Sequence, residues 1–151
     1  MKLSGDQFIP VPRETVWDAL NDANVLRQSV PGCQALEGSI DDGFTATAVA
    51  KIGPVKATFT GEISISDIVV GESYTLRGEG KGGVAGFARG QANVTLSDDT
   101  QDGQEGTRLT YDVEASVGGK LAQIGGRLVD AAAKKLADEF FRTFKATLEH
   151  S

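Results

Sequence analysis

The stretch FTATAVAKIGPVKATFTGEISI, residues 44–65, decides the fold of this chain. Apolar or small residues alternate with polar ones on both sides of Gly53-Pro54, so every second side chain falls on one face. Glycine followed by proline is typical of a turn between two strands. The stretch therefore predicts an antiparallel hairpin with one apolar face.

The same alternation extends in both directions, from Cys33 to Val117. Short connections rich in glycine and aspartate predict that consecutive strands pair as hairpins, and the polar run 97–103 is expected to be a loop. Upstream, residues 2–9 predict a strand, which is followed by two short helices. The first helix begins near Pro12, and the second covers residues 24–29.

The last segment, residues 120–149, has apolar residues at helical spacing along one face and predicts a long amphipathic helix. At 1.5 Å per residue it would be about 45 Å long. A domain of this size has a diameter of only about 35–40 Å. The helix should therefore either project beyond the domain or bend at Gly125-Gly126.

A sheet with one apolar face needs a cover, and only this helix is large enough to provide it. The predicted fold class is α+β: a curved antiparallel sheet of six or seven strands wrapped around the C-terminal helix, with two short helices after the first strand. Residues 1–151 are expected to form a single domain.

Composition excludes several function classes. The chain has 21 acidic and 15 basic residues and a net charge of −6, which argues against nonspecific nucleic-acid binding. One cysteine, Cys33, and one histidine, His150, leave too few ligands for a Cys-rich or multi-histidine metal site. The chain shows neither an apolar run of about 20 residues nor a signal peptide, so a cytoplasmic location is expected.

Small residues are common on the strand faces that should point inward, and 19 of the 151 residues are glycine. They could allow sheet and helix to pack closely, or they could leave a cavity for an apolar ligand, and the sequence leaves both interpretations open. A cavity would be lined by these candidate ligand-binding residues: Phe44, Phe59, Ile63, Leu76, Leu109, Tyr111, Ile124, Gly125, Leu128, Leu136 and Phe140.

No motif in the sequence predicts catalysis. The run Gly78–Gly83 matches G-x-G-x-x-G, but it leads toward another strand rather than opening a helix, so a dinucleotide site is not expected. Cys33 is interpreted as a small apolar residue at a strand start. Tyr111 is the main polar group expected inside. We predict no catalytic residue, no metal and no cofactor.

Several segments together resemble the carbon monoxide dehydrogenase CoxG family. This family belongs to the START/Bet v 1-like (SRPBCC) superfamily, which has the helix-grip fold. The similar segments run in order through nearly the whole chain: 16–22 (VWDALND), 30–33 (VPGC), 51–57 (KIGPVKA), 78–83 (GEGKGG), 86–90 (GFARG), 107–111 (TRLTY) and 117–125 (VGGKLAQIG).

The resemblance implies a hydrophobic-ligand cavity between sheet and helix, and association with a molybdenum hydroxylase of the carbon monoxide dehydrogenase type. It also implies handling of the quinone that accepts the enzyme's electrons. The sequence ends just after the helix, without the Pro/Ala-rich extension and hydrophobic tail of longer members. We therefore expect peripheral membrane contact at most.

Three hypotheses follow for the function. The leading one is noncatalytic binding of an apolar molecule such as a quinone. The second is a docking or assembly protein for the enzyme, with its cavity filled by its own side chains. The third is a cyclase- or hydrolase-like enzyme, which would need a buried acid or base.

Overall fold

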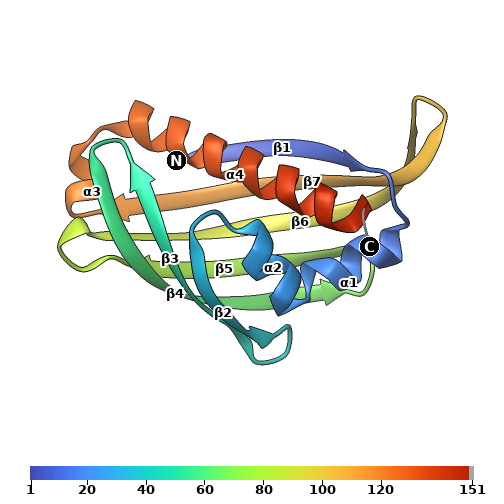
Figure 1. Ribbon diagram of the computed structural model, residues 1–151, viewed down its shortest axis with the longest axis horizontal. Coiled ribbons are helices and arrows are strands. Elements are labelled where there is room, and N and C mark those ends of the chain that lie inside the picture. The colour runs from blue at the N-terminus through green and yellow to red at the C-terminus, as the bar shows by residue number, and fades with distance from the viewer. Residues whose placement is uncertain (150–151) are drawn as a thin grey trace.

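The computed structural model describes residues 1–149 (Figure 1). Seven strands form one curved antiparallel sheet in the order β1-β7-β6-β5-β4-β3-β2. The elements are β1 (Lys2–Ile9), α1 (Arg13–Leu20), α2 (Ala23–Ser29), β2 (Cys33–Ser39), β3 (Gly43–Ile52), β4 (Val55–Val69), β5 (Ser73–Lys81), the 3₁₀ turn η1 (Gly83–Ala85), β6 (Phe87–Gln101), β7 (Gln104–Gly118), α3 (Lys120–Gln123) and α4 (Gly126–Glu149).

The sheet curves around α4, and the short helices α1 and α2 close one side (Figure 1). From β2 to β7 each strand pairs with its neighbour in sequence, while β1 pairs with β7. The predicted α+β architecture, including the two short helices after the first strand, is confirmed.

The predicted loop at residues 97–103 is wrong, because strands β6 and β7 continue through it. Gln101 pairs with Gln104 around a two-residue turn, Asp102-Gly103, in which both residues have positive φ angles of 53° and 78°. Aspartate followed by glycine favours this tight turn, whose twist matches that of the flanking strands.

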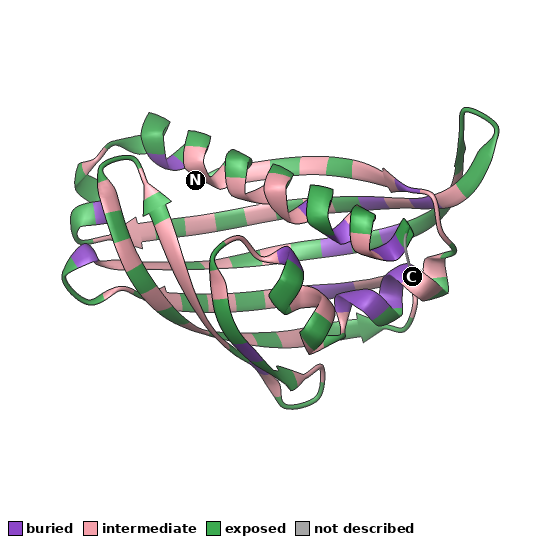
Figure 2. Cartoon of the chain, in the orientation of Figure 1, coloured by how far each residue is buried: buried purple, intermediate pink, exposed green. Residues whose placement is uncertain are grey.

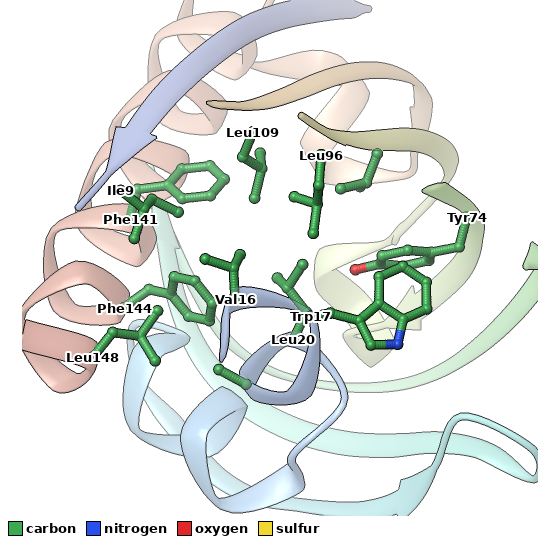
Figure 3. Close-up of a cluster of buried hydrophobic side chains, with 12 residues drawn as sticks. Ile9, Val16, Trp17, Leu20, Tyr74, Leu96, Leu109, Phe141, Phe144 and Leu148 are labelled. Carbon is green, nitrogen blue, oxygen red and sulfur yellow. The ribbon is translucent and has the colours of Figure 1, made fainter. Parts of the chain in front are cut away.

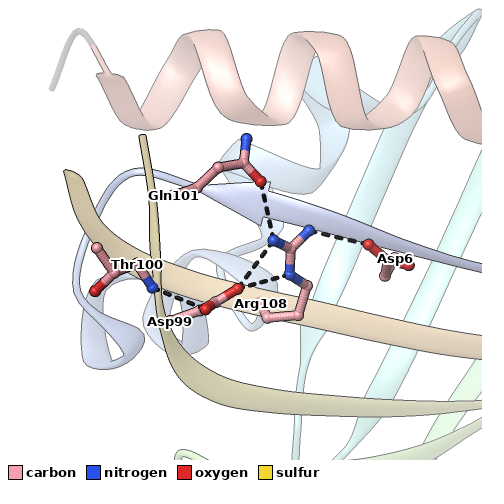
Figure 4. Close-up of polar contacts among 5 residues, drawn as sticks. All are labelled: Asp6, Asp99, Thr100, Gln101 and Arg108. Atoms are coloured by element: carbon pink, nitrogen blue, oxygen red, sulfur yellow. Dashed lines mark hydrogen bonds and ion pairs between the residues drawn. The ribbon is translucent and has the colours of Figure 1, made fainter. Parts of the chain in front are cut away.

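The hairpin is held by Arg108, which binds three side chains from strands β1 and β6 (Figure 4). Its guanidinium donates to Asp99 and Gln101, each at 2.9 Å, and to Asp6 on β1 at 3.0 Å. The Thr100 amide and this guanidinium together lower the pKa of the Asp99 carboxyl. This polar run therefore remains in the sheet because Arg108, on the neighbouring strand β7, binds two of its side chains.

The C-terminal helix is interrupted near the expected bend. Helix α3 ends at Gln123 and α4 begins at Gly126. Between them Gly125 has a φ of 96°, a left-handed conformation that an α-helix cannot contain. The break restarts the helix in a new phase and lets α4 lie along the sheet.

The hydrophobic core lies at one end of the sheet, where α1 and the last turns of α4 meet the strands (Figures 2 and 3). Ile9, Val16 and Phe144 are fully buried there. Trp17 packs edge-on against Tyr74, with ring centroids 5.5 Å apart. Thr107, also fully buried, donates its hydroxyl hydrogen to the Val11 carbonyl at 2.8 Å. The opposite half of the sheet has few fully buried residues (Figure 2).

Candidate functional site

An apolar cavity of about 260 Å³ lies beside this core, between the sheet and the helices. Its walls come from the middle of the strands, from Leu20 of α1 and Leu26 of α2, and from Ala137, Phe140 and Phe141 of α4. Every lining side chain is aliphatic or aromatic. The cavity therefore offers a ligand hydrophobic contact and very few polar groups.

The polar groups in the lining are two tyrosine hydroxyls. Tyr74 on β5 is buried against Trp17, and this burial raises the pKa of its phenol to about 12. Tyr111 on β7 stacks on Phe141, with ring centroids 5.3 Å apart. Within residues 1–149 neither hydroxyl has a hydrogen-bond partner. Each can therefore donate to a bound acceptor without breaking a hydrogen bond to another described residue.

Gly5 on β1 positions the Tyr111 ring. A Cβ atom on Gly5 would lie 2.6 Å from the Tyr111 hydroxyl oxygen and 2.8 Å from Cζ, closer than any real side chain could come. Because this position has no side chain, the Tyr111 ring can pack directly against the backbone of β1. Burial raises the pKa of Tyr111, and the negative charge of Asp138 on α4 adds to the effect.

Six of the eleven candidate residues from the sequence line this cavity. They are Phe44, Ile63, Leu76, Leu109, Tyr111 and Phe140. All but Phe140 are on strands, where the two-residue period assigns each side chain to a face without knowledge of the tertiary structure.

The other five candidates lie outside the cavity. Phe59 packs against the backbone of Gly82, where an added Cβ would be 2.5 Å from its ring. Ile124 and Leu128 lie at the β3–β4 turn, within 3.5 and 3.7 Å of where a Gly53 Cβ would stand, and Leu128 is 49% exposed. Gly125, in the helix break, and Leu136, half-buried on α4, are likewise absent from the lining.

Several lining residues were missed. Tyr74 follows the same alternation as Leu76, so its inward orientation could have been read from the sequence. Leu26 and Val30 are brought to the cavity by the packing of α2 on α4, and no local pattern indicates this contact. The other strand residues missed are Leu3, Leu36, Ile65, Ala92, Val94 and Val113.

Two other hollows are polar. The larger is an open valley of about 1270 Å³ on the outer face of the sheet, lined by charges of both signs such as Glu62 and Arg77. The smaller, about 370 Å³, lies between α2 and α4 and includes Arg27, Glu139 and Cys33. Neither is enclosed by apolar side chains, so the cavity beside the core is the better ligand site although it is smaller.

The structure gives no functional role to the motifs that the sequence analysis rejected as catalytic or nucleotide-binding. Gly78 and Gly80 lie within β5, and the run ends in the turn η1 before β6, so no helix begins there to bind a phosphate. The Cys33 thiol donates to the Ala35 carbonyl at 3.4 Å. His150 lies outside the described residues. Within residues 1–149, no cluster of three His, Cys, Asp or Glu residues could hold a metal ion.

Comparison with known families identifies the chain's relatives. The sequence model of CoxG, a family of carbon monoxide dehydrogenase subunits, matches residues 5–149. The chain belongs to the CoxG family. No curated protein matches its sequence.

Solved structures similar to this CoxG chain share its fold. A conserved protein from Geobacillus kaustophilus is 32% identical, with a TM-score of 0.90 over 100% of this chain and 97% of that one. The protein TTHA0849 from Thermus thermophilus is 14% identical, with a TM-score of 0.69 over 99% and 98%. Ara h 8.0201, also 14% identical, gives 0.65 over 100% and 99%. The last two support the Bet v 1-like fold alone.

Family and fold together indicate a role in hydrophobic-ligand binding or as an accessory protein. Among the described helices of this CoxG chain, none is long and apolar enough to cross a membrane.

Proposed function

We propose that this CoxG protein binds a quinone in the apolar cavity, as a noncatalytic accessory of a carbon monoxide dehydrogenase-type molybdenum hydroxylase in the cytoplasm. The observation that carries the proposal is the cavity lining, which consists of apolar side chains and two tyrosine hydroxyls without partners among the described residues. The family's name supports the enzyme as partner.

A quinone matches the chemistry of this lining. Its flat ring can stack against Phe140 and Phe141, and its two carbonyl oxygens accept hydrogen bonds of the kind that Tyr74 and Tyr111 can donate. A phosphate or carboxylate would lose its hydration without an opposite charge to replace it, because no lysine or arginine lines the cavity. An uncharged, acceptor-bearing ring is therefore favoured over an anion.

The volume suggests that the cavity holds only part of such a ligand. At about 260 Å³, the cavity is just below the range of roughly 300–1000 Å³ usual for small-molecule sites, so it suits the ring better than a ring with a long tail. Beyond it, the inner face of the sheet continues as small, half-buried residues. These are Ala46, Ala48, Ala50, Ala57, Ala88 and Ala115. We place an isoprenoid tail along them, toward the β3–β4 turn.

The lining also explains why we propose a carrier and not an enzyme. Apart from the two tyrosine phenols, whose pKa values burial raises, it contains no group that could act as acid, base or nucleophile. The two tyrosines orient the ring, while its electrons come from the partner enzyme. A docking role without ligand is the alternative, and the same binding experiment decides between them.

The test is a titration of Trp17 fluorescence with a short-chain naphthoquinone, since Trp17 contacts the cavity residue Tyr74. We expect saturable binding. Tyr74→Phe and Tyr111→Phe each remove one hydroxyl and should weaken it about 2- to 12-fold, the usual worth of one hydrogen bond.

A methylnaphthalene of similar shape is the control ligand. It has no carbonyl, so it should bind the wild-type protein and both variants equally. Equal, unsaturable quenching of all three proteins by the quinone would reject the site and leave the docking role.

A further inference from the structure

Four residues on the inner face of the sheet lie in one row across four neighbouring strands. Tyr74 on β5 pairs with Val94 on β6, and Val94 pairs with Tyr111 on β7. Tyr111 in turn pairs with Gly5 on the edge strand β1. Residues that pair directly across antiparallel strands share one face of the sheet. The row therefore crosses the wall of the cavity and contains both tyrosines of the chain, one on each side of Val94.

This row separates the two tyrosines by two strand spacings. Neighbouring strands lie about 4.8 Å apart, so the backbones of Tyr74 and Tyr111 are about 10 Å apart. Two hydrogen bonds of about 2.7 Å, one at each end of a para-quinone, place the two donor oxygens roughly 10–11 Å apart. The tyrosines can therefore donate to both carbonyl oxygens of one ring, provided that their hydroxyls do not lean toward each other over Val94.

The Tyr111 side chain leans the other way, onto β1. The place where a Gly5 Cβ would stand is 2.6 Å from the Tyr111 hydroxyl oxygen, 2.8 Å from Cζ and 3.2 Å from Cε1. The outer half of the ring thus lies over Gly5, on the side of β7 that is turned away from Tyr74. A side chain at position 5 would occupy the same space.

The backbone of β1 does not itself require a glycine at position 5. The φ angle of Gly5 lies outside the left-handed region, and the pairing of β1 with β7 is regular through this residue. Glycine within a strand weakens the strand, because it has no side chain to pack and loses the most conformational entropy on folding. The Tyr111 ring, rather than a turn or a bulge, therefore accounts for Gly5.

We propose that Gly5 is a positioning residue of the quinone site: by letting Tyr111 lean onto β1, it sets the separation at which both tyrosine hydroxyls reach one ring. The inference rests on the proposed quinone binding and adds a residue that is absent from the cavity lining. A Cβ at position 5 would push the hydroxyl oxygen from 2.6 Å to an ordinary contact of at least 3.4 Å, a shift of about 0.8 Å back toward Val94.

The experiment compares Gly5→Ala with the wild type in the Trp17 fluorescence titration, with the short-chain naphthoquinone and the methylnaphthalene as ligands. Gly5→Ala should weaken naphthoquinone binding about 2- to 12-fold, because the displaced hydroxyl loses its hydrogen bond. Any space that the moving ring takes from the cavity acts on both ligands and cancels in the ratio of their affinities. The ratio of naphthoquinone to methylnaphthalene affinity should therefore fall by the same factor.

Two further variants show whether the effect passes through Tyr111. In Gly5→Ala/Tyr111→Phe the affinity ratio should equal that of Tyr111→Phe alone, because the hydroxyl that Gly5 positions is absent. Gly80→Ala is the matched control. Gly80 shares the inner face of β5 with Tyr74 by alternation, lies outside the cavity lining and leaves open space for a Cβ. Gly80→Ala should bind both ligands as the wild type does.

A measurement on the wild type makes the test independent of how well Gly5→Ala folds. Nuclear Overhauser contacts between the Gly5 α-protons and the Tyr111 ring should persist when the naphthoquinone binds. The positioning role is overturned if these contacts disappear on binding, if Gly5→Ala keeps the wild-type affinity ratio, or if the double variant falls below Tyr111→Phe. Absence of saturable naphthoquinone binding by the wild type would instead reject the quinone site itself, and the positioning role with it.

Discussion

Replacing Ala137 with leucine tests whether the cavity is a real void. Ala137 lies on α4, half-buried, and lines the cavity. Leucine adds three carbon atoms on that side without introducing a polar group. Ala131 on the same helix is exposed, so Ala131→Leu makes the same chemical change outside the cavity and serves as the control.

The expected magnitude follows from burial. Three buried carbons contribute up to about 2.4 kcal/mol at roughly 0.8 each, and ordering a leucine side chain costs about 0.5–1. The free energy of unfolding should therefore rise by about 1.5 kcal/mol, which raises Tm by roughly 3–6 °C for a chain of this length. In a densely packed region the same substitution would cost about 1–3 kcal/mol, so the sign of the change distinguishes void from packed core.

Thermal and urea unfolding followed by far-UV circular dichroism measure this change, and the naphthoquinone titration measures its effect on binding. Ala137→Leu should bind at least tenfold more weakly, because leucine occupies the space of the ring. A Tm below that of both wild type and Ala131→Leu, or unchanged quinone affinity, would show that the space is already filled or lies elsewhere.

Two further predictions concern stability. Because burial raises the pKa of Tyr74 to about 12, the unfolded chain loses this proton first. The free energy of unfolding should then fall by about 2–3 kcal/mol as pH rises from 10 to 12, while Tyr74→Phe should not show this fall in denaturant titrations. Gly86 has a φ of 106° and its Cβ would meet the Gly118 carbonyl, so Gly86→Ala should lower Tm, whereas Gly126→Ala, facing open space in a helix, should raise it slightly in calorimetry.

The strands were predictable from the sequence because their side chains alternate strictly between faces. A residue such as Ile63 or Tyr111 is assigned to the inner face by counting from its neighbours. The exception is the hairpin at 98–105, because its acidic composition is typical of a loop. The interaction that retains it in the sheet comes from Arg108, which also reaches Asp6 on β1, 102 residues away, and no local pattern shows such a contact.

The helix was harder to predict in detail than the strands. A stripe traced in steps of four residues, such as Leu128, Leu136 and Phe140, turns by 400° per step and so drifts 40° around the helix each time. The break at Gly125 adds a change of phase. Val129, rather than Leu128, is the buried residue at the start of α4, and the cavity lies along the second half of the helix.

The two interpretations of the small residues hold in different places. Gly82 and Gly118 face the rings of Phe59 and Phe87, which occupy the space that a side chain would take, so there the glycines serve close packing. At the cavity, Ala92 from the sheet and Ala137 from the helix line the same space, and small residues meet small residues. Free volume depends on both facing surfaces together. Because a sequence shows each surface without its partner, a count of small residues cannot distinguish a tight interface from a binding site, whereas the pairing of elements can.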